Sequence, residues 1–276
     1  MDNFLVLLMT GFFIGTLGTL IGAGGGFLLV PLLILTHPTL SAETITAISI
    51  FIVAVNAISG SVAYARSGRI DYKAGVLFAI CTIPGSILGV LTTQYIPREM
   101  FNVTFGILLI LLGTFLLYKT FHETVVSVAA TAGGPALTQQ HLTDSEGTQY
   151  NYSYNQTYGI IVSILVGYLS PLLGIGGGII HVPAMIHWLQ FPIYIATATS
   201  HFILAIMSTV SVIVHAVRGS YDDAGVLKMI LWLSLGVIPG AQLGAYLSHK
   251  IKSRTIIRAL AVCLAVVGLR ILLLNA

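Results

Sequence analysis

The sequence predicts an all-α integral membrane protein built from two homologous halves in inverted orientation. Composition is the first reason: 56% of the 276 residues are hydrophobic and only 8% are charged, against about 25% charged residues in a soluble domain. The second reason is a series of long apolar segments, and the third is a set of motifs that occurs once in each half. Because a water-soluble fold could not bury so much apolar surface, we expect a multi-pass protein of the cell membrane.

Ten apolar segments follow one another along the chain. Those of about 20 residues are long enough to cross a ~30 Å hydrocarbon core as helices. Helices are expected because backbone polar groups cannot remain unpaired in lipid, and because the segments lack the short alternation of membrane β-strands. The predicted segments cover roughly residues 4–20, 23–35, 44–65, 74–94, 101–118, 159–173, 176–190, 193–217, 224–247 and 255–274.

A polar stretch separates the first five segments from the last five. It runs from His122 to Tyr158 and is rich in Thr, Gln, Tyr, Asn and Gly, so we expect a linker or loop. The predicted organisation is a first transmembrane repeat at 1–120, a polar linker at 121–157 and a second transmembrane repeat at 158–276.

Four motifs of the first half recur in the same order in the second half. Such a series predicts an internal duplication. IGAGGGFLLVP (21–31) matches LGIGGGIIHVP (173–183), TAISIF (46–51) matches TATSHF (197–202), AGV (74–76) matches AGV (224–226), and IPGSILG (83–89) matches IPGAQLG (238–244).

The first apolar block indicates how the two copies are oriented. Residues 4–35 contain no charged side chain. As one helix they would span about 48 Å, too long for one crossing, yet they are too short for two full crossings. Two short segments that meet at the glycines fit better, as a re-entrant hairpin or as a pair of broken helices. The block then contributes an even number of crossings, each half crosses an odd number of times, and the second half is inverted.

The positive charges agree with an inverted arrangement. Lysine and arginine are enriched in cytoplasmic loops, so the larger set is expected inside and both termini outside. With odd parity, eight of the twelve fall on one side, namely Arg66, Arg69, Lys73, Lys119, Lys250, Lys252, Arg254 and Arg258, and four on the other, namely Arg98, Arg218, Lys228 and Arg270.

The two glycine motifs are the predicted binding site. Glycine is a poor helix former, yet each motif lies in a strongly apolar segment. Interrupted helices at matching positions of inverted halves are typical of transporter binding sites. A helix start has unpartnered N–H groups and partial positive charge, and glycine lets a ligand approach them, so two facing starts would hold an anion. The residues are Gly22, Gly24, Gly25, Gly26, Gly174, Gly176, Gly177 and Gly178.

Two other interpretations of the glycines remain open. Gly18, Gly22 and Gly26 are spaced by four residues, a pattern that lets membrane helices pack closely. A nucleotide-binding loop is the third interpretation, but GAGGGF lacks the final glycine of GxGxxG.

Five polar residues within the apolar segments are further candidates for substrate binding. Ser49 and Ser200 occupy matching positions in the two copies, His201 follows Ser200, and Asn56 and His181 lie near the two motifs. Polar side chains at membrane depth usually face protein or water, and a histidine could donate to an anion or carry a proton. The alternative is structural, with serine bonded to backbone carbonyl groups and histidine bonded in the core.

The sequence weighs against several classes of function. No catalytic motif or pair of carboxylates lies in the apolar segments, so we expect no enzyme, cofactor or metal site. A basic run interleaved with aromatic residues is also missing, which weighs against nucleic acid. The expected partners are a small anion, the lipid bilayer and a coupling ion, H⁺ or Na⁺, and a homodimer is permitted. A passive anion channel and a non-transporting scaffold remain alternatives to a secondary transporter.

The motifs resemble those of the TauE/SafE family, also grouped as the toluene sulfonate uptake permeases. The resemblance rests on LIGAGGGFLLVP and LLGIGGGIIHVP, on TAISIF and TATSHF, and on the paired IPG-x-x-LG segments, and it covers the chain apart from the polar linker. It implies transport of small sulfur-containing anions such as sulfite, sulfoacetate and related organosulfonates. Because Ile50 in the first half stands where the second half has His201, the two half-sites are not expected to be equivalent.

Overall fold

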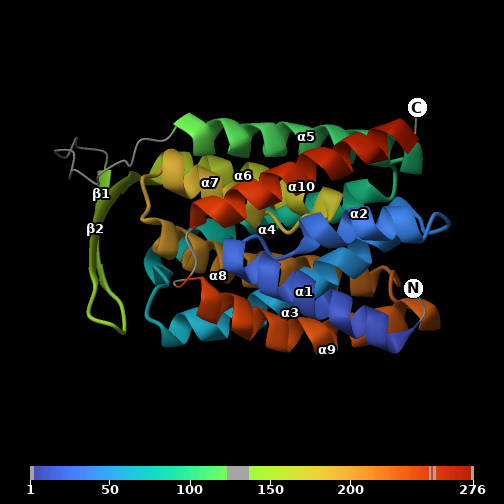
Figure 1. Cartoon of the computed structure of the whole chain (residues 1–276), viewed down its shortest axis with the longest axis horizontal. Helices are drawn as coiled ribbons and strands as arrows, with labels where there is room; N and C mark the ends of the chain where they lie inside the picture. The colour runs from blue at the N-terminus through green and yellow to red at the C-terminus, as the bar shows by residue number, and fades with distance from the viewer. Residues whose placement is uncertain (1–2, 123–136, 249, 251–252, 275–276) are drawn as a thin grey trace.

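The described part of the chain forms a bundle of ten helices with one β-hairpin at one end (Figure 1). The computed structural model describes residues 3–122, 137–248, 250 and 253–274. The elements in order are α1 (Phe4–Ile21), α2 (Gly26–Thr36), α3 (Ala42–Arg66), α4 (Tyr72–Thr93), α5 (Arg98–His122), β1 (Leu137–Thr143), β2 (Gln149–Asn155), α6 (Gln156–Leu173), α7 (Gly178–His187), α8 (Ile193–Val217), α9 (Ala224–Leu247) and α10 (Ser253–Leu274).

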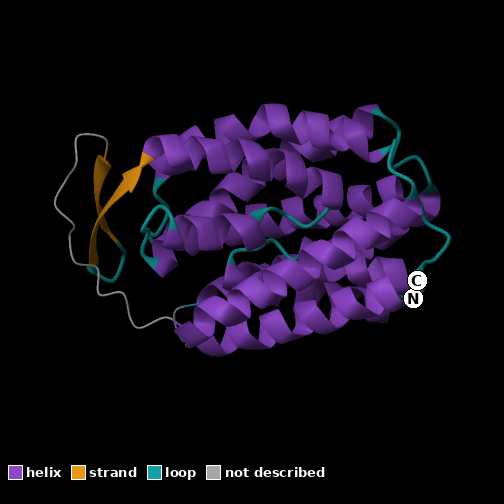
Figure 2. Ribbon diagram, turned by 90° about the horizontal axis from the view of Figure 1, so that it is seen from above, coloured by secondary structure: helices purple, strands orange, loops and turns teal. Residues whose placement is uncertain are grey.

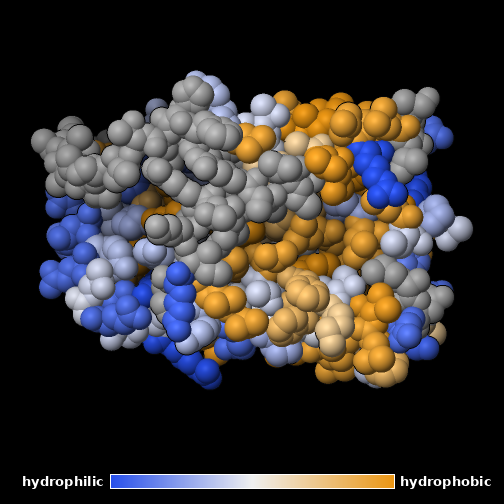
Figure 3. Space-filling view, in the orientation of Figure 1, coloured by the Kyte–Doolittle hydropathy of each residue, from blue (hydrophilic) through white to orange (hydrophobic). Residues whose placement is uncertain are grey.

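The outer surface of the bundle is that of a multi-pass membrane protein. Within the described residues, seven helices are long and apolar enough to cross a membrane. Large apolar side chains point outward, among them Phe13 and Leu111, each 61% exposed. Figure 3 shows such residues along the side of the bundle, with hydrophilic residues gathered at the end that carries the β-hairpin. The prediction of an all-α membrane bundle is therefore confirmed.

Each glycine motif lies at the tip of a short helical hairpin. We call the end of the bundle with β1 and β2 the hairpin end, and the other the opposite end. α1 begins and α2 ends at the opposite end of the bundle, whereas α6 begins and α7 ends at the hairpin end (Figures 1 and 2). In both places two helices meet at the glycines, as predicted. α2 and α7 are short, with 11 and 10 residues, but α1 and α6 have 18 residues each and are long enough to cross a membrane.

Glycines bring the helices of the bundle into close contact. α1 packs along α9, and a Cβ atom built on Gly11 would lie 2.2 Å from the carbonyl oxygen of Leu233. α6 packs along α4, where a Cβ on Gly167 would lie 2.5 Å from the carbonyl oxygen of Thr82. Small residues therefore allow the backbones of these helix pairs to approach closely, as they do in other membrane proteins.

Residues 137–155 of the predicted polar linker form a β-hairpin rather than an irregular loop. β1 and β2 pair antiparallel from Leu137 opposite Asn155 to Thr143 opposite Gln149. In QYNYSYN every second residue is tyrosine, so the aromatic rings share one face of the strand. Tyr152 and Tyr154 are buried against the bundle. Residues 123–136 of the predicted linker lie outside the described part of the chain.

Candidate functional site

Both glycine motifs break their helices with three glycines at positive φ. After α1 ends, Gly22, Gly24 and Gly25 have φ angles of 78°, 80° and 85°. After α6 ends, the matching Gly174, Gly176 and Gly177 have φ angles of 68°, 79° and 50°. L-residues rarely adopt positive φ, so this geometry explains three of the four glycines in each motif.

The fourth glycine of each motif lies where the two breaks touch. A Cβ atom built on Gly26 would lie 2.3 Å from the carbonyl oxygen of Gly174, and one built on Gly178 would lie 2.1 Å from that of Gly22. Gly26 and Gly178 have no positive φ, so it is close approach that requires glycine here. The two breaks therefore pack backbone against backbone in the interior of the bundle.

The helix starts at the breaks have unpartnered backbone donors. Among the described residues, no acceptor is found for the N–H groups of Gly25, Gly26 and Phe27 at the start of α2, or for those of Gly177 and Ile179 at the start of α7. All five residues are buried. Buried N–H groups are nearly always paired, so a ligand that accepts hydrogen bonds would be stabilised here.

The two matched serines each bond across to the other half of the chain. Ser49 on α3 donates to the carbonyl oxygen of Gly174 at 2.6 Å, and Ser200 on α8 donates to that of Gly22 at 3.3 Å. Both side chains are fully buried. In this conformation the hydroxyls therefore hold the carbonyl ends of α6 and α1 at the breaks.

We expect Ser49→Ala to destabilise the protein more than Ser200→Ala does. Removing a donor leaves a buried carbonyl unpartnered, which costs about 1–3 kcal/mol, and the Ser49 bond is the shorter of the two. Thermal unfolding of the purified variants checks the order. Equal melting temperatures, or a lower one for Ser200→Ala, would contradict this assignment.

A buried polar cluster lies beside the first break and includes two predicted residues, Asn56 and His201. Thr19 on α1 donates through its hydroxyl to Asn56 Oδ1 at 2.8 Å and lies 3.2 Å from His201 Nε2. A Cβ atom built on Gly18 would lie 2.5 Å from the N atom of Gly25 and 2.8 Å from Asn56 Nδ2. Asn56 Nδ2 has no hydrogen-bond partner in the described structure, so this side-chain donor and the backbone N atom of Gly25 both lie beside Gly18.

His181 is buried but belongs to different surroundings. Its Nε2 lies 3.3 Å from Ser163 Oγ on α6, and its ring packs edge-on against Phe78 with centroids 6.2 Å apart. The structure thus brings together Gly22–Gly26, Gly174–Gly178, Ser49, Ser200, Asn56 and His201, and leaves His181 outside the Asn56 cluster.

Sequence reasoning missed Thr19 and Tyr64 in this cluster. Tyr64 donates to the carbonyl oxygen of Thr19 at 2.8 Å and lies edge-on to the His201 ring. Thr19 stands among leucines and glycines, and Pro171 occupies the matching place in the second half. The duplication therefore gave no signal for it, and only the packing of α1 against α3 and α8 reveals its role.

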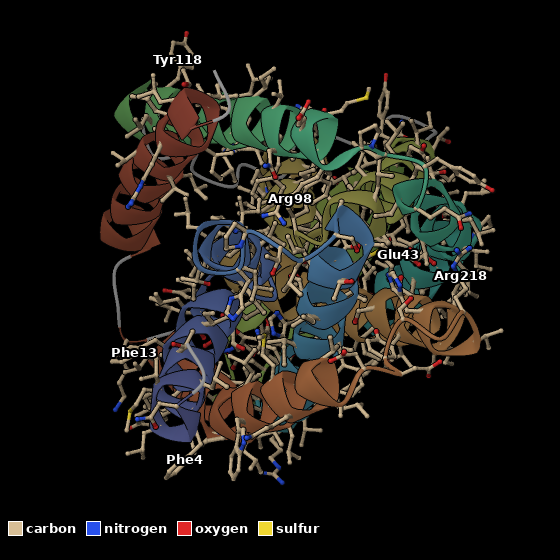
Figure 4. The ribbon with its side chains drawn as sticks, turned by 90° about the vertical axis from the view of Figure 1, so that its right-hand side faces the viewer. Phe4, Phe13, Glu43, Arg98, Tyr118 and Arg218 are labelled. Carbon is tan, nitrogen blue, oxygen red and sulfur yellow. The ribbon has the colours of Figure 1, made fainter. Side chains whose placement is uncertain are left out.

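Two arginines at the opposite end are engaged with other groups. Arg98 donates to the carbonyl oxygens of Ile34, in the last turn of α2, and of His37 and Leu40, which follow that helix. Arg218 pairs with Glu43 at 3.5 Å and donates to Gln94. Figure 4 shows Glu43 and Arg218 close together at this end.

The β-hairpin is attached to the bundle by buried polar contacts. Tyr152 donates to Asp71 at 2.6 Å, and Arg69 pairs with Asp144 at 3.3 Å. Burial raises the pKa of Tyr152, and its hydrogen bond to the Asp71 carboxylate raises it further. Burial alone would raise the pKa of Asp144, but the N–H groups of Thr148 and Glu146 and the Arg69 guanidinium outweigh it and lower that pKa.

This lowered pKa predicts acid sensitivity of the hairpin contact. Ionised Asp144 contributes its full stabilisation above its unfolded pKa of about 3.9, and the contribution is lost as pH falls through the lower folded pKa. We expect the melting temperature to fall with acidification between about pH 5 and pH 2, and Asp144→Asn to flatten that slope. A variant with the wild-type slope would show that Asp144 does not carry the effect.

Comparison with known proteins agrees with the sequence resemblance. The family model "Sulfite exporter TauE/SafE" matches residues 7–271. "Probable membrane transporter protein YunE" of Bacillus subtilis is 32% identical over 98% of this chain and 97% of its own length. "Probable membrane transporter protein MJ0441" of Methanocaldococcus jannaschii is 26% identical over 97% and 95%. No solved structure matches the chain significantly.

These matches extend over nearly the whole chain and over nearly the whole of both relatives. Both relatives carry the name of a membrane transporter, and neither is named as an enzyme. The protein therefore belongs to the TauE/SafE family of multi-pass membrane proteins.

Proposed function

We propose that the protein is a secondary transporter that moves small sulfur-containing anions, such as sulfite, sulfoacetate or related organosulfonates, by alternating access. The observation that carries the proposal is the meeting of two glycine breaks whose helix starts have unpartnered N–H groups. Partial positive charge at the starts of α2 and α7 favours an anion. The family description, a sulfite exporter, supports the substrate class.

The proposed binding site includes both glycine motifs and the side chains around them. Gly25, Gly26 and Gly177 would supply backbone donors, and close approach would be possible at the other glycines of the motifs, Gly22, Gly24, Gly174, Gly176 and Gly178. Asn56 Nδ2 is an unpartnered donor beside Gly25. Ser49, Ser200 and His201 would join when the breaks separate, because their present partners are groups of the breaks or of the Thr19 cluster. His181, on α7, would contact the anion from the side of the hairpin end.

We also infer that residues 1–120 and 158–276 are inverted copies joined by the 121–157 segment. The hairpins α1–α2 and α6–α7 enter from opposite ends of the bundle (Figure 1). Packing is reciprocal, since α1 lies on α9 and α6 lies on α4. The bonds from Ser49 to Gly174 and from Ser200 to Gly22 are reciprocal too. A pseudo-twofold axis in the membrane plane would produce these three features together.

Counterflow in proteoliposomes tests the proposal. Vesicles loaded with sulfite, sulfate, thiosulfate, sulfoacetate or taurine are diluted, and entry of labelled sulfoacetate or sulfite is followed. A carrier accelerates entry when a transported anion is inside. Conductive entry without this acceleration would show a channel, and neither entry nor stabilisation by any anion would favour a scaffold.

A further inference from the structure

A buried hydrogen-bond chain favours one tautomer of His201. Thr19 Oγ1 donates to Asn56 Oδ1 at 2.8 Å and lies 3.2 Å from His201 Nε2. A hydroxyl has one hydrogen. Since Thr19 gives it to Asn56, the Thr19 oxygen accepts from the N–H at Nε2. The neutral imidazole therefore presents the lone pair of Nδ1.

This lone pair is buried and accepts no hydrogen bond in the described structure. His201 is fully buried, and within the described structure Nδ1 has no hydrogen-bond partner. An unpartnered polar atom in a protein interior needs an explanation. A proton is one chemical species that Nδ1 can bind in the space available, since it adds no heavy atom.

The surroundings of His201 contain one other titratable group. α1 contributes Thr19, and α3 contributes Asn56, Gly60 and Tyr64. The backbone carbonyl groups of Gly22 and Asn56 also face the ring and would favour a protonated imidazole. Tyr64 faces the ring with centroids 5.7 Å apart, and its hydroxyl is already donated to the Thr19 carbonyl. Across the described residues, no ion pair involves His201 and no lysine, arginine or carboxylate bonds to it.

An anion at the breaks would need a compensating charge. A lone charge in a low-dielectric interior is costly unless it is paired. Arg98 and Arg218 are bonded at the opposite end, whereas His201 follows Ser200, which bonds to Gly22 of the first break. A protonated imidazole would supply one positive charge beside the anion.

We propose that His201 binds the coupling proton of this transporter, at Nδ1, so that proton and anion move together. This inference rests on the proposed function of anion transport. The proton adds to the Nδ1 lone pair to give an imidazolium on one side of the membrane. It leaves the same atom on the other side after the anion has gone.

His201→Asn and His215→Asn make a matched pair for the test, because His215 lies outside the proposed binding site. Both histidines are on α8 and fully buried. In each, one ring nitrogen lies beside a hydroxyl, that of Ser220 at 3.2 Å for His215, and the other has no hydrogen-bond partner in the described structure. Asparagine keeps a side-chain N–H donor and cannot titrate. Thr19→Val is a second variant, because it removes the hydroxyl that accepts from Nε2 and keeps His201.

Two assays use labelled sulfoacetate in proteoliposomes of the full chain. The first measures counterflow at equal pH, which needs no proton gradient. The second imposes a gradient of one pH unit with the membrane potential clamped at zero. One proton per anion then supports about tenfold accumulation. We expect this accumulation from the wild type and His215→Asn, none from His201→Asn, and a smaller value from Thr19→Val. Counterflow should keep its wild-type rate in His215→Asn. In His201→Asn it should be slower but measurable, because asparagine keeps a side-chain N–H donor.

The outcomes separate this inference from the proposed function. Wild-type counterflow without accumulation, or full accumulation by His201→Asn, would overturn the role of His201 and leave the carrier intact. Loss of counterflow in both His201→Asn and Thr19→Val would make the cluster part of anion binding alone and also overturn it. Absence of wild-type sulfoacetate counterflow would count against the proposed substrate and this inference together.

Discussion

Gly25→Ala is expected to reduce anion counterflow by at least about tenfold, because a methyl group at the first break disturbs the donors at the start of α2. Its Cβ would lie 2.6 Å from Ile14 Cγ2 and 3.0 Å from the Ile14 carbonyl oxygen. Either α1 moves away or the backbone of the break rotates. Each change misplaces the N–H groups of Gly25 and Gly26.

Gly147→Ala is the matched control for this prediction. Gly147 has φ of 83° and Gly25 has 85°, so alanine meets the same backbone strain, about 1–2 kcal/mol, at both positions. A Cβ on Gly147 would meet no atom within 4 Å. Counterflow by Gly147→Ala should stay near that of the wild type. If purified, folded Gly25→Ala transported as well as Gly147→Ala, the backbone-donor site would be wrong.

Arg69→Met is expected to release the β-hairpin and lower stability. The side chains of Arg69 and Asp144 are 6% and 0% exposed. Removing the arginine leaves the Asp144 carboxylate without its counter-charge, while the N–H groups of Glu146 and Thr148 still donate to it, so the loss is about 1–3 kcal/mol. For a chain of this size the melting temperature should fall by about 5 °C, and β1 and β2 should become sensitive to protease.

Glu146→Gln separates the buried ion pair from the exposed one. Arg69 also lies 3.5 Å from Glu146, whose side chain is 62% exposed. An exposed pair contributes at most about 1 kcal/mol, so Glu146→Gln should change the melting temperature little. Arg69→Met combined with Asp144→Asn should regain part of the loss. Equal effects of Arg69→Met and Glu146→Gln would show that the buried pair does not hold the hairpin.

The glycine breaks could be predicted from sequence because their cause is local. Positive φ at Gly22, Gly24 and Gly25 requires glycine whatever surrounds it, so the motif itself marks the break. The duplication then marked the second break and the matched pair Ser49 and Ser200. What those serines bond to could not be predicted, because each partner is a carbonyl of the other half.

The polar contacts of the hairpin and of Thr19 could not be predicted for a different reason. Tyr152 and Asp71 are 81 residues apart, and Thr19 and His201 are 182 apart. Nothing in the local pattern near either residue encodes the partner. The composition of the 121–157 segment is polar, which favoured a loop, although its alternating tyrosines were a signal for a strand with one buried face.

A structure with bound selenite, a heavier analogue of sulfite, tests most directly whether the two helix breaks hold the anion. We expect anomalous density between Gly22–Gly26 and Gly174–Gly178, within hydrogen-bond distance of Asn56 Nδ2 and of the N–H groups that begin α2 or α7. Density confined to Arg98 or Arg218 at the opposite end, with the two breaks still in backbone contact, would contradict it.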